Sequence, residues 1–260
     1  MQKAIEIIGL FWSTSLEAEL EYRWNFLVAS LTSCLNLVGS IFSLFLFYRT
    51  GYHFAGWSWA EAMMVLSFFI LLQGISSTLF EPNLNRIVNH IQQGTLDYIL
   101  LKPISSQFWL SLRVISIWGI PDLLFALIVM IYSGRQLHLS WHSYLLSLLP
   151  ILTSCLILYS IWYLLATTSI WFVKVNNITE VLRGVLQAGR YPISAYPVMY
   201  RAFFTFVIPI VFLTTVPAET VLHRVPTNLA IGSFLLAIVL PIIANLFWRY
   251  ALRFYTSASS

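Results

Sequence analysis

Long stretches without a charged residue constrain this chain more than any other feature. No Lys, Arg, Asp or Glu occurs between Arg23 and Arg49, and none occurs between Arg135 and Lys174. About 20 apolar residues are enough for a helix to cross the hydrocarbon core of a bilayer. Only 9% of the residues are charged, against roughly a quarter in a soluble domain. The sequence therefore predicts an all-α membrane protein with no room for a separate soluble catalytic domain.

Six membrane-spanning helices are expected from the positions of the charged residues. The fifth contains Pro209 and the sixth contains Pro241. The expected spans lie near residues 24–48, 61–80, 114–133, 144–170, 201–217 and 228–248. Residues 1–260 are interpreted as one transmembrane domain, with long loops near 81–113 and 171–200.

Residues 1–23 are expected to form an amphipathic helix that lies in the membrane interface. Ile8, Trp12 and Leu16 recur at helical spacing, with acidic residues elsewhere around the helix. An ordinary cytosolic helix is the alternative. Glu6 interrupts the apolar run that a secretory signal peptide would need, so a signal peptide is not expected.

Lys and Arg are unequally divided between the two sides of the membrane. Six spans place both termini on one side, together with eleven of the 14 Lys and Arg residues, among them Arg183, Arg190 and Arg201. Lys and Arg are enriched in cytoplasmic loops. Both termini are therefore expected in the cytoplasm. The net charge of +4 is interpreted as a consequence of topology, and no nucleic-acid partner is expected.

The first long loop has the pattern of two short helices. Between Pro82 and Gly94, four apolar residues share one helical face; they are Leu84, Ile87, Val88 and Ile91. Thr95 is expected to cap a second short helix, which Pro103 ends.

The second long loop is expected to contain a helix that ends at Gly189 and Pro192. Its apolar stripe is formed by Ile178, Val181, Leu182, Val185 and Leu186. An apolar stripe outside the bilayer is covered either by lipid headgroups or by a partner protein. For residues 171–200 the interpretation is contact with lipid headgroups.

The segment GTLDYILLKPIS, residues 94–105, resembles the signature loop of type-2 ABC exporter permeases. In that family a Gly-Thr-Leu/Met-acid-x-Leu-Leu-x-x-Pro-Ile/Leu-Ser pattern follows the second membrane helix. Here the acid is Asp97 where Glu is more usual, and one residue fewer separates Leu101 from Pro103. These departures resemble a branch of bacterial permeases whose loop reads much like IRxGxLDxxLLKPxxxxF. The interface helix, the six spans and the cytoplasmic termini also agree with the family.

This resemblance implies the fold of a type V ABC exporter and a half-transporter in the cytoplasmic membrane of a bacterium. The implied partners are a dimer of ABC ATPase subunits and a second permease, which is either an identical copy or a sister subunit. The loop would be the coupling element that receives the movement of the ATPase. The implied coupling residues are Gly94, Thr95, Leu96, Asp97, Leu100, Leu101, Lys102 and Pro103. We expect Leu96, Leu100 and Leu101 in a groove of the ATPase, with Asp97 and Lys102 at its rim.

The sequence contains no G-x-x-x-x-G-K-[ST] motif, and so lacks a Walker-type phosphate site. ATP and Mg²⁺ are therefore expected in the partner ATPase, and no cofactor, catalytic residue or metal site is expected in this chain. His138 and His142 are four residues apart, but no third ligand is evident. Cys34 and Cys155 are interpreted as packing residues.

Polar residues inside the expected spans are candidates for the translocation path. Ser33, Asn36 and Ser40 follow one another at helical spacing on the first span, and Asp122 lies well inside the third. A buried acid costs about 2.5–3.5 kcal/mol on the insertion scale. Helix packing is the alternative for the serines, and a structural hydrogen bond is the alternative for Asp122.

The sequence disfavours two other classes of function. An intramembrane enzyme needs a nucleophile with a base, or paired acids, within reach of each other, and neither arrangement is apparent. An ion-coupled secondary transporter or a channel without an ATPase is the remaining alternative, although a single intramembrane acid and no internal repeat disfavour it. The expected substrate is a hydrophobic or amphipathic compound, drug-like or lipid-like.

Overall fold

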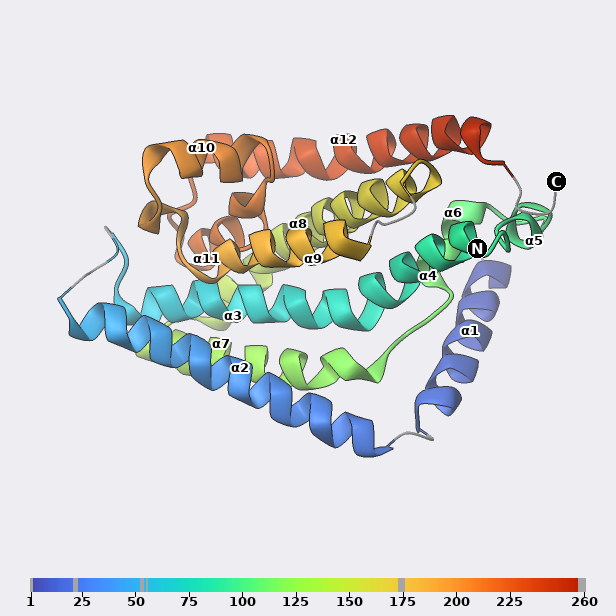
Figure 1. Cartoon of the computed structure of the whole chain (residues 1–260). Helices are drawn as coiled ribbons and strands as arrows, with labels where there is room; N and C mark the ends of the chain where they lie inside the picture. Colours follow the sequence, from blue (N-terminus) through green and yellow to red (C-terminus); the bar gives the residue numbers. More distant parts are fainter. Residues whose placement is uncertain (1, 21–22, 52–53, 55, 173–175, 257–260) are drawn as a thin grey trace.

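The chain forms a bundle of long helices (Figure 1). The computed structural model describes residues 2–20, 23–51, 54, 56–172 and 176–256. The structure is 83% helical, and the described residues include no strand. The all-α fold class predicted from the sequence is therefore confirmed.

The long helices are accompanied by several short ones. The α-helices are α1 (Gln2–Leu20), α2 (Arg23–Arg49), α3 (Trp59–Ile75), α4 (Glu81–Gln92), α5 (Asp97–Leu100), α6 (Ser106–Leu112), α7 (Ile120–Gln136), α8 (Trp141–Thr167), α9 (Asn176–Leu186), α10 (Val198–Phe206), α11 (Thr215–Val221) and α12 (Thr227–Ala251). A π-helical turn, η1 (Ser76–Phe80), joins α3 to α4. The 3₁₀ turns are η2 (Ile117–Gly119), η3 (Thr168–Ile170), η4 (Gln187–Arg190), η5 (Ile193–Ala195), η6 (Ile210–Phe212) and η7 (Leu252–Phe254).

Within the described residues, five helical stretches are long and apolar enough to cross a membrane. They are Trp24–Arg49, Trp59–Gln92, Ile117–Gln136, Trp141–Ile170 and Thr227–Phe254. A bent pair of helices, Val198–Phe206 and Ile210–Val221, gives a sixth candidate if it is counted as one span, with a bend of 73°. The chain is thus a multi-pass membrane protein.

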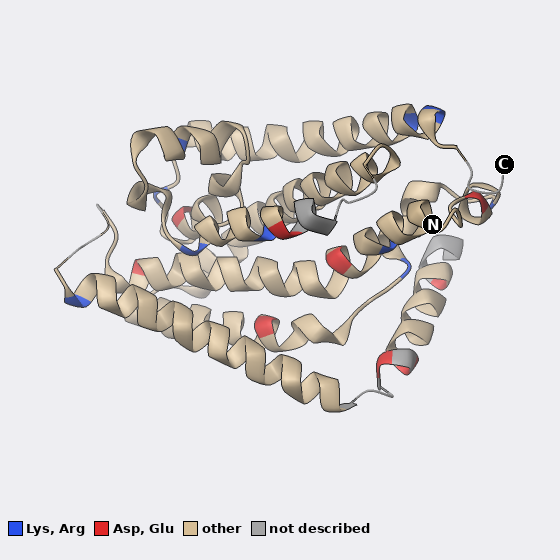
Figure 2. Ribbon diagram, viewed as in Figure 1, with Lys and Arg blue, Asp and Glu red and all other residues tan. Residues whose placement is uncertain are grey.

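The bundle has two distinct ends (Figure 1). One end, which we call the loop end, holds α1, α4, α5, α6 and the last turns of α12. The other, the far end, holds α10, α11, the last turn of α2 and the first turn of α3. α1 runs at a steep angle to the long helices, and few charged residues lie along the length of the bundle (Figure 2).

α3 lies at the centre of the bundle because its neighbours can approach it closely. A Cβ atom added at Gly74 would lie 2.8 Å from the side chain of Leu123 on α7, and one added at Gly119 would overlap the carbonyl oxygen of Gly74. Small residues allow membrane helices to pack backbone against backbone. Most of the apolar stretch that contains α3 is consequently buried.

The chain returns toward the far end earlier than the sequence predicts. α9 and η4 lead from the end of α8 toward the far end (Figure 1), in contact with α8 and α3 respectively. The range 201–217, expected as the fifth span, is instead divided among α10, η6 and α11, which lie at the far end. The expected loop 171–200 therefore contains a helix that packs along the bundle.

The charged residues of the segment 171–200 led to the prediction that it lies outside the bilayer. In the structure, Arg183 and Arg190 of this segment have partners within the bundle. Arg183 on α9 forms a 2.7 Å ion pair with Glu81 at the start of α4, and the Arg190 guanidinium lies 5.4 Å from the ring centroid of Phe69 on α3. Paired charges are tolerated in an apolar environment. Leu182 is buried in the protein core and Leu186 packs against it, so the stripe expected to face lipid headgroups is covered in part by protein. The side chain of Ile178 lies outside the described residues.

Candidate functional site

Residues 81–113 form a folded loop whose first helix was predicted correctly. Pro82 lies in the first turn of α4, and Gly94 follows its end with a φ of +66°. A positive φ suits Gly because it has no Cβ atom. Leu84, Ile87 and Val88 are buried, as their spacing predicts.

Asn83 closes this loop at its base, a role that sequence reasoning missed. Its side-chain Oδ1 accepts a hydrogen bond from the backbone N–H of Val114 at 2.8 Å, and its Nδ2 donates to the carbonyl oxygen of Val114 at 2.7 Å. One buried amide thus ties the start of α4 to the segment that leads into α7. Nothing in the local sequence pattern distinguishes this asparagine from others.

The turn after α4 is held by Thr95, although not in the predicted way. Its hydroxyl lies 2.8 Å from Nδ1 of His90, and its backbone N–H donates to the carbonyl oxygen of His90 at 2.9 Å. The residue before α5 is Leu96, and no side chain caps that helix. The prediction that Thr95 caps the second helix is therefore wrong, because its hydroxyl is used by the preceding helix.

The tip of the loop has an inner and an outer apolar side. Leu96 is fully buried and Ile99 is 4% exposed, whereas Leu100 is 38%, Tyr98 71% and Leu101 82% exposed. Leu96 packs in the core of this chain, so it positions the tip and does not reach a partner surface as expected. Tyr98 was not among the predicted residues; its spacing of three from Leu101 on a helix was the available signal.

The expected rim residues contact their own chain. The Lys102 ammonium lies 3.7 Å from the ring centroid of Trp109 on α6, a cation–π contact. Burial and the neighbouring Asp97 carboxylate raise the pKa of Tyr255, which follows α12. Pro103 is exposed just beyond α5. The tip is therefore braced by α6 and by the C-terminal segment.

α1 is attached to the same loop. The indole N–H of Trp12 donates to the carbonyl oxygen of Leu112 at 3.3 Å. The backbone N–H of Ile117 donates to the Glu19 carboxylate at 2.6 Å, and the Arg113 guanidinium lies 4.7 Å from the ring of Phe11. The N-terminal helix and the loop thus form one contiguous layer at the loop end.

The four candidate translocation residues come together between α2 and α7. Ser33, Asn36, Ser40 and Asp122 all line one small void of about 10 Å³, which is room for roughly one water molecule. Ser33, Ser40 and Asp122 are buried, whereas Asn36 is exposed.

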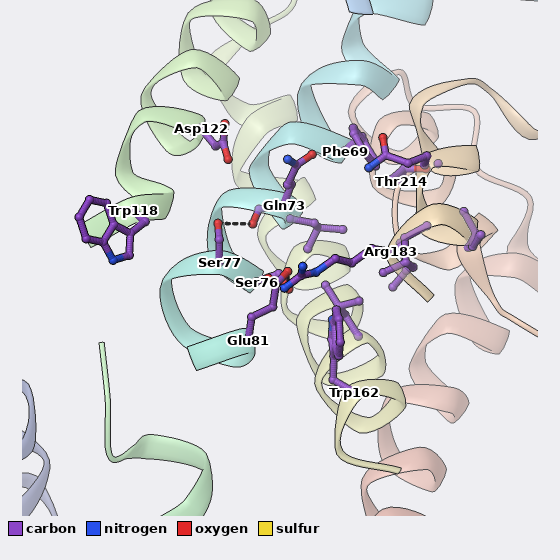
Figure 3. Close-up of a pocket in the computed structure, with 17 residues that line it drawn as sticks. Phe69, Gln73, Ser76, Ser77, Glu81, Trp118, Asp122, Trp162, Arg183 and Thr214 are labelled. Carbon is purple, nitrogen blue, oxygen red and sulfur yellow. Dashed lines mark hydrogen bonds and ion pairs between the residues drawn. The ribbon is translucent and has the colours of Figure 1, made fainter. Parts of the chain in front are cut away.

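A larger cavity of about 320 Å³ lies next to this void. Figure 3 shows residues from α3, α7, α8 and α9 around it. Its apolar lining residues are Phe69, Leu72, Trp118, Leu158, Trp162, Leu186, Ile210 and Leu213. Its polar lining residues are Gln73, Ser76, Ser77, Glu81, Asp122, Arg183, Gln187 and Thr214. Of these, only Asp122 was singled out from the sequence.

An ion-pair cluster forms one edge of the cavity. Arg183 donates to Glu81 and to Glu180, at 2.7 Å each, and Ser76 on η1 donates to Glu81 at 3.1 Å. Glu81 and Arg183 are 102 positions apart in the sequence, so no local pattern predicts their pairing. The cluster joins the junction of α3 and α4 to α9.

The described part of the chain contains no cluster of potential metal ligands. No three His, Cys, Asp or Glu side chains come together there as metal ligands would. Cys34 and Cys155 are both free thiols.

Comparison with protein families gives one match. The family model described as "ABC-2 family transporter protein" matches residues 34–259. The match covers the loop, the cavity and every candidate span except the first turns of α2. A search of curated proteins and a search of solved structures gave no match.

Proposed function

The chain belongs to the ABC-2 family of transporter proteins, and we propose that it is the permease half of an exporter driven by a separate ATPase. Members of this family are non-catalytic membrane subunits that normally work with an ATPase subunit. The multi-pass helical architecture agrees with this role.

The observation that carries the proposal is the exposed apolar tip of the loop at residues 94–103. Tyr98, Leu100 and Leu101 project from a base that is fixed by the buried Leu96 and Ile99. Exposed apolar and aromatic side chains on a rigid support are typical of protein interfaces. We therefore assign Tyr98, Leu100 and Leu101 to contact with the ATPase, and Gly94, Thr95, Leu96, Asp97, Lys102 and Pro103 to holding the tip in place.

Under this proposal, the ATPase subunit supplies the energy for transport. The sequence has no Walker-type phosphate site, so ATP and Mg²⁺ bind to the ATPase. ATP binding and hydrolysis then shift the permease between inward-facing and outward-facing states through differential contacts at the tip.

The loop end is assigned to the cytoplasm of a bacterium, where an ATPase would be supplied with ATP. Arg86, Lys102, Arg113, Arg249 and Arg253 belong to segments at this end. Arg183, Arg190 and Arg201, expected on the same side, instead lie along α9 and η4 or toward the far end. The bias of Lys and Arg is weaker than the sequence alone implies, but it keeps its direction.

A second permease, either an identical copy or a sister subunit, is assigned to the outward face of α2. Only 11% of the apolar window on this helix is buried. Asn36 lines the small void beside Asp122 and is also exposed, so it lies at the edge of this face. An amide in the hydrocarbon layer needs a hydrogen-bonding partner. A neighbouring permease or a water-filled path between two permeases provides one.

The test is to place a charge on the tip. Leu101→Asp is expected to abolish co-purification of the ATPase subunit from mild detergent, because it introduces a carboxylate into an apolar interface. Gln93→Asp, which adds the same charge to an exposed position of the same loop, is the control and should leave the complex intact. Both variants should insert into the membrane at the level of the unmodified chain.

Two results contradict the proposal. One is normal recovery of the ATPase with Leu101→Asp. The other is transport by the purified chain in vesicles that contain neither ATP nor an ATPase, which would identify an ion-coupled carrier or a channel.

A further inference from the structure

The 320 Å³ cavity lies within a single chain and combines two kinds of surface. Phe69, Trp118 and Leu213 belong to its apolar wall, and Gln73 and Gln187 belong to its polar wall. Pockets for organic molecules have this composition, an apolar lining with a few polar groups that fix orientation. A cavity that only compensates for imperfect packing needs no such polar groups and is usually apolar.

Several polar atoms on the wall have no protein partner. Among the described residues, the Trp162 indole Nε1, the Thr214 hydroxyl and the Gln187 carbonyl oxygen are enclosed without a hydrogen bond. Trp162 is 1% exposed and Thr214 is 2% exposed. An enclosed polar group without a partner is destabilising, because it has lost its hydrogen bonds to water and gained none in the protein. Three such groups belong to residues that line one cavity, and a bound molecule that reaches them would complete their hydrogen bonds.

The charges on the wall favour a cation. Glu81 and Asp122 contribute two carboxylates, whereas Arg183 is the only basic residue among the described residues of the wall. Arg183 already donates to Glu81 and to Glu180 outside the cavity. Arg190 lines the neighbouring small void instead. Because Arg183 pairs with Glu81, Asp122 is the wall carboxylate without an ion-pair partner among the described residues, and a ligand with a positive charge would balance it.

We propose that this cavity binds an amphipathic organic cation. Its charged head lies at the carboxylate of Asp122, its hydrogen-bonding groups meet Trp162 and Thr214, and its aromatic or aliphatic body contacts the apolar wall (Figure 3). The assignment of this ligand as transported cargo rests on the proposed permease function. The binding itself does not require the ATPase.

The first experiment compares three probes on the full chain in lipid nanodiscs, without nucleotide or ATPase and with empty discs subtracted. Propranolol has an aromatic body, a hydroxyl and an ammonium group. N-acetylpropranolol has the same body and hydroxyl without the charge, and naphthalene has the body alone. Propranolol is expected to bind saturably and at least tenfold more tightly than either of the others, because only its charge can pair with the carboxylate of Asp122.

The second experiment uses matched variants. Thr214→Val and Trp162→Phe should each weaken propranolol binding roughly three- to tenfold, which is the loss of one hydrogen bond. Asp122→Asn should weaken it at least tenfold. Thr153→Val and Trp248→Phe are the controls, because the Thr153 hydroxyl is paired with Ser233 and the Trp248 indole donates to Ser106. Both controls should leave binding unchanged.

Stability gives an independent readout. Thr214→Val should raise the melting temperature of the empty chain, because it removes an enclosed hydroxyl that has no partner. Thr153→Val should lower it, because it breaks a buried hydrogen bond. A ligand site therefore predicts opposite effects of Thr214→Val on stability and on binding.

Four results overturn the proposal. They are the absence of saturable propranolol binding, equal affinity for all three probes, binding that neither Thr214→Val nor Trp162→Phe weakens, and equal weakening by the controls. These outcomes are independent of whether Leu101→Asp releases the ATPase. Failure of the ligand site can thus be distinguished from failure of the proposed coupling.

Discussion

α2 and the stretch formed by α3 and α4 are both apolar enough to span a membrane, yet they occupy opposite environments. The apolar window of the stretch Trp59–Gln92 is 67% buried, whereas that of α2 is 11% buried. Lipid tails are as apolar as Leu, so burial of apolar surface alone does not draw a helix into a membrane bundle. Close packing at small residues and hydrogen bonds between helices do so. Gly74 and the bond from the Ser133 hydroxyl to the carbonyl oxygen of Ala60 provide both for α3.

This difference shows that entry of a helix into the membrane and its burial within the bundle have different causes, although a hydropathy value does not distinguish them. Apolarity decides whether a segment enters the membrane, whereas small and polar residues decide how deeply it lies among the other helices. The polar residues of α2, such as Asn36, then become informative because they lie on a helix whose surface is mostly exposed.

The largest effect is expected from Gly119→Val. A side chain there would overlap the Gly74 carbonyl oxygen and the Thr78 hydroxyl, forcing η2 away from α3. We expect a loss of stability of more than about 4 kcal/mol, with little monodisperse protein in size-exclusion chromatography. Gly39→Ala on α2 meets open space and should leave the yield unchanged. Equal yields for the two variants would remove the contrast between the helices.

A smaller loss is expected from Leu66→Ala on α3. Leu66 is buried on all sides, and truncation of a buried Leu costs about 2–5 kcal/mol because it leaves a cavity. Leu35→Ala on the exposed face of α2 should cost less than about 0.5 kcal/mol. Thermal unfolding of the purified chain measures both. If Leu35→Ala destabilises only the assembled complex, that face of α2 is covered by protein and not by lipid.

The smallest effect of the three is expected from Asn83→Ala in α4. It leaves the N–H and the carbonyl oxygen of Val114 without their partner, at a cost of about 1–3 kcal/mol. Asn36→Ala on α2 is the matched control and should not change the stability of the isolated chain. Hydrogen exchange at residues 112–117 should rise in Asn83→Ala, and protection equal to that of the unmodified chain would exclude a closing role for Asn83.

Local periodicity predicted the parts of the fold in which neighbouring residues decide the outcome. The buried positions Leu84, Ile87 and Val88 follow from helical spacing, and the turn at Gly94 follows from its residue type. Local periodicity could not predict which apolar residues of the loop tip are buried and which are exposed. α5 has four residues, so apolar residues lie on both of its sides, and only the position of the core identifies Leu96 as the inner one.

The other features that the sequence did not predict depend on contacts between residues far apart in the chain. The charge of Arg183 made residues 176–190 resemble a helix outside the bilayer, because its partner Glu81 belongs to a helix 102 positions earlier. The cavity residues come from separate helices and have no common spacing. The placement of Trp162 and Thr214 therefore depends on the whole bundle and not on any one segment.

The pair of hydrogen bonds between the Asn83 side chain and the Val114 backbone has a mechanical consequence. Because the two ends of the loop at residues 81–113 are pinned together, displacement of its tip cannot be absorbed by spreading its base. A push at Leu101 would reach α3 and α7 at the same instant and turn them as a single lever. The displacement of α3 and α7 that follows a movement of the tip would then depend on how firmly the Asn83 side chain holds Val114.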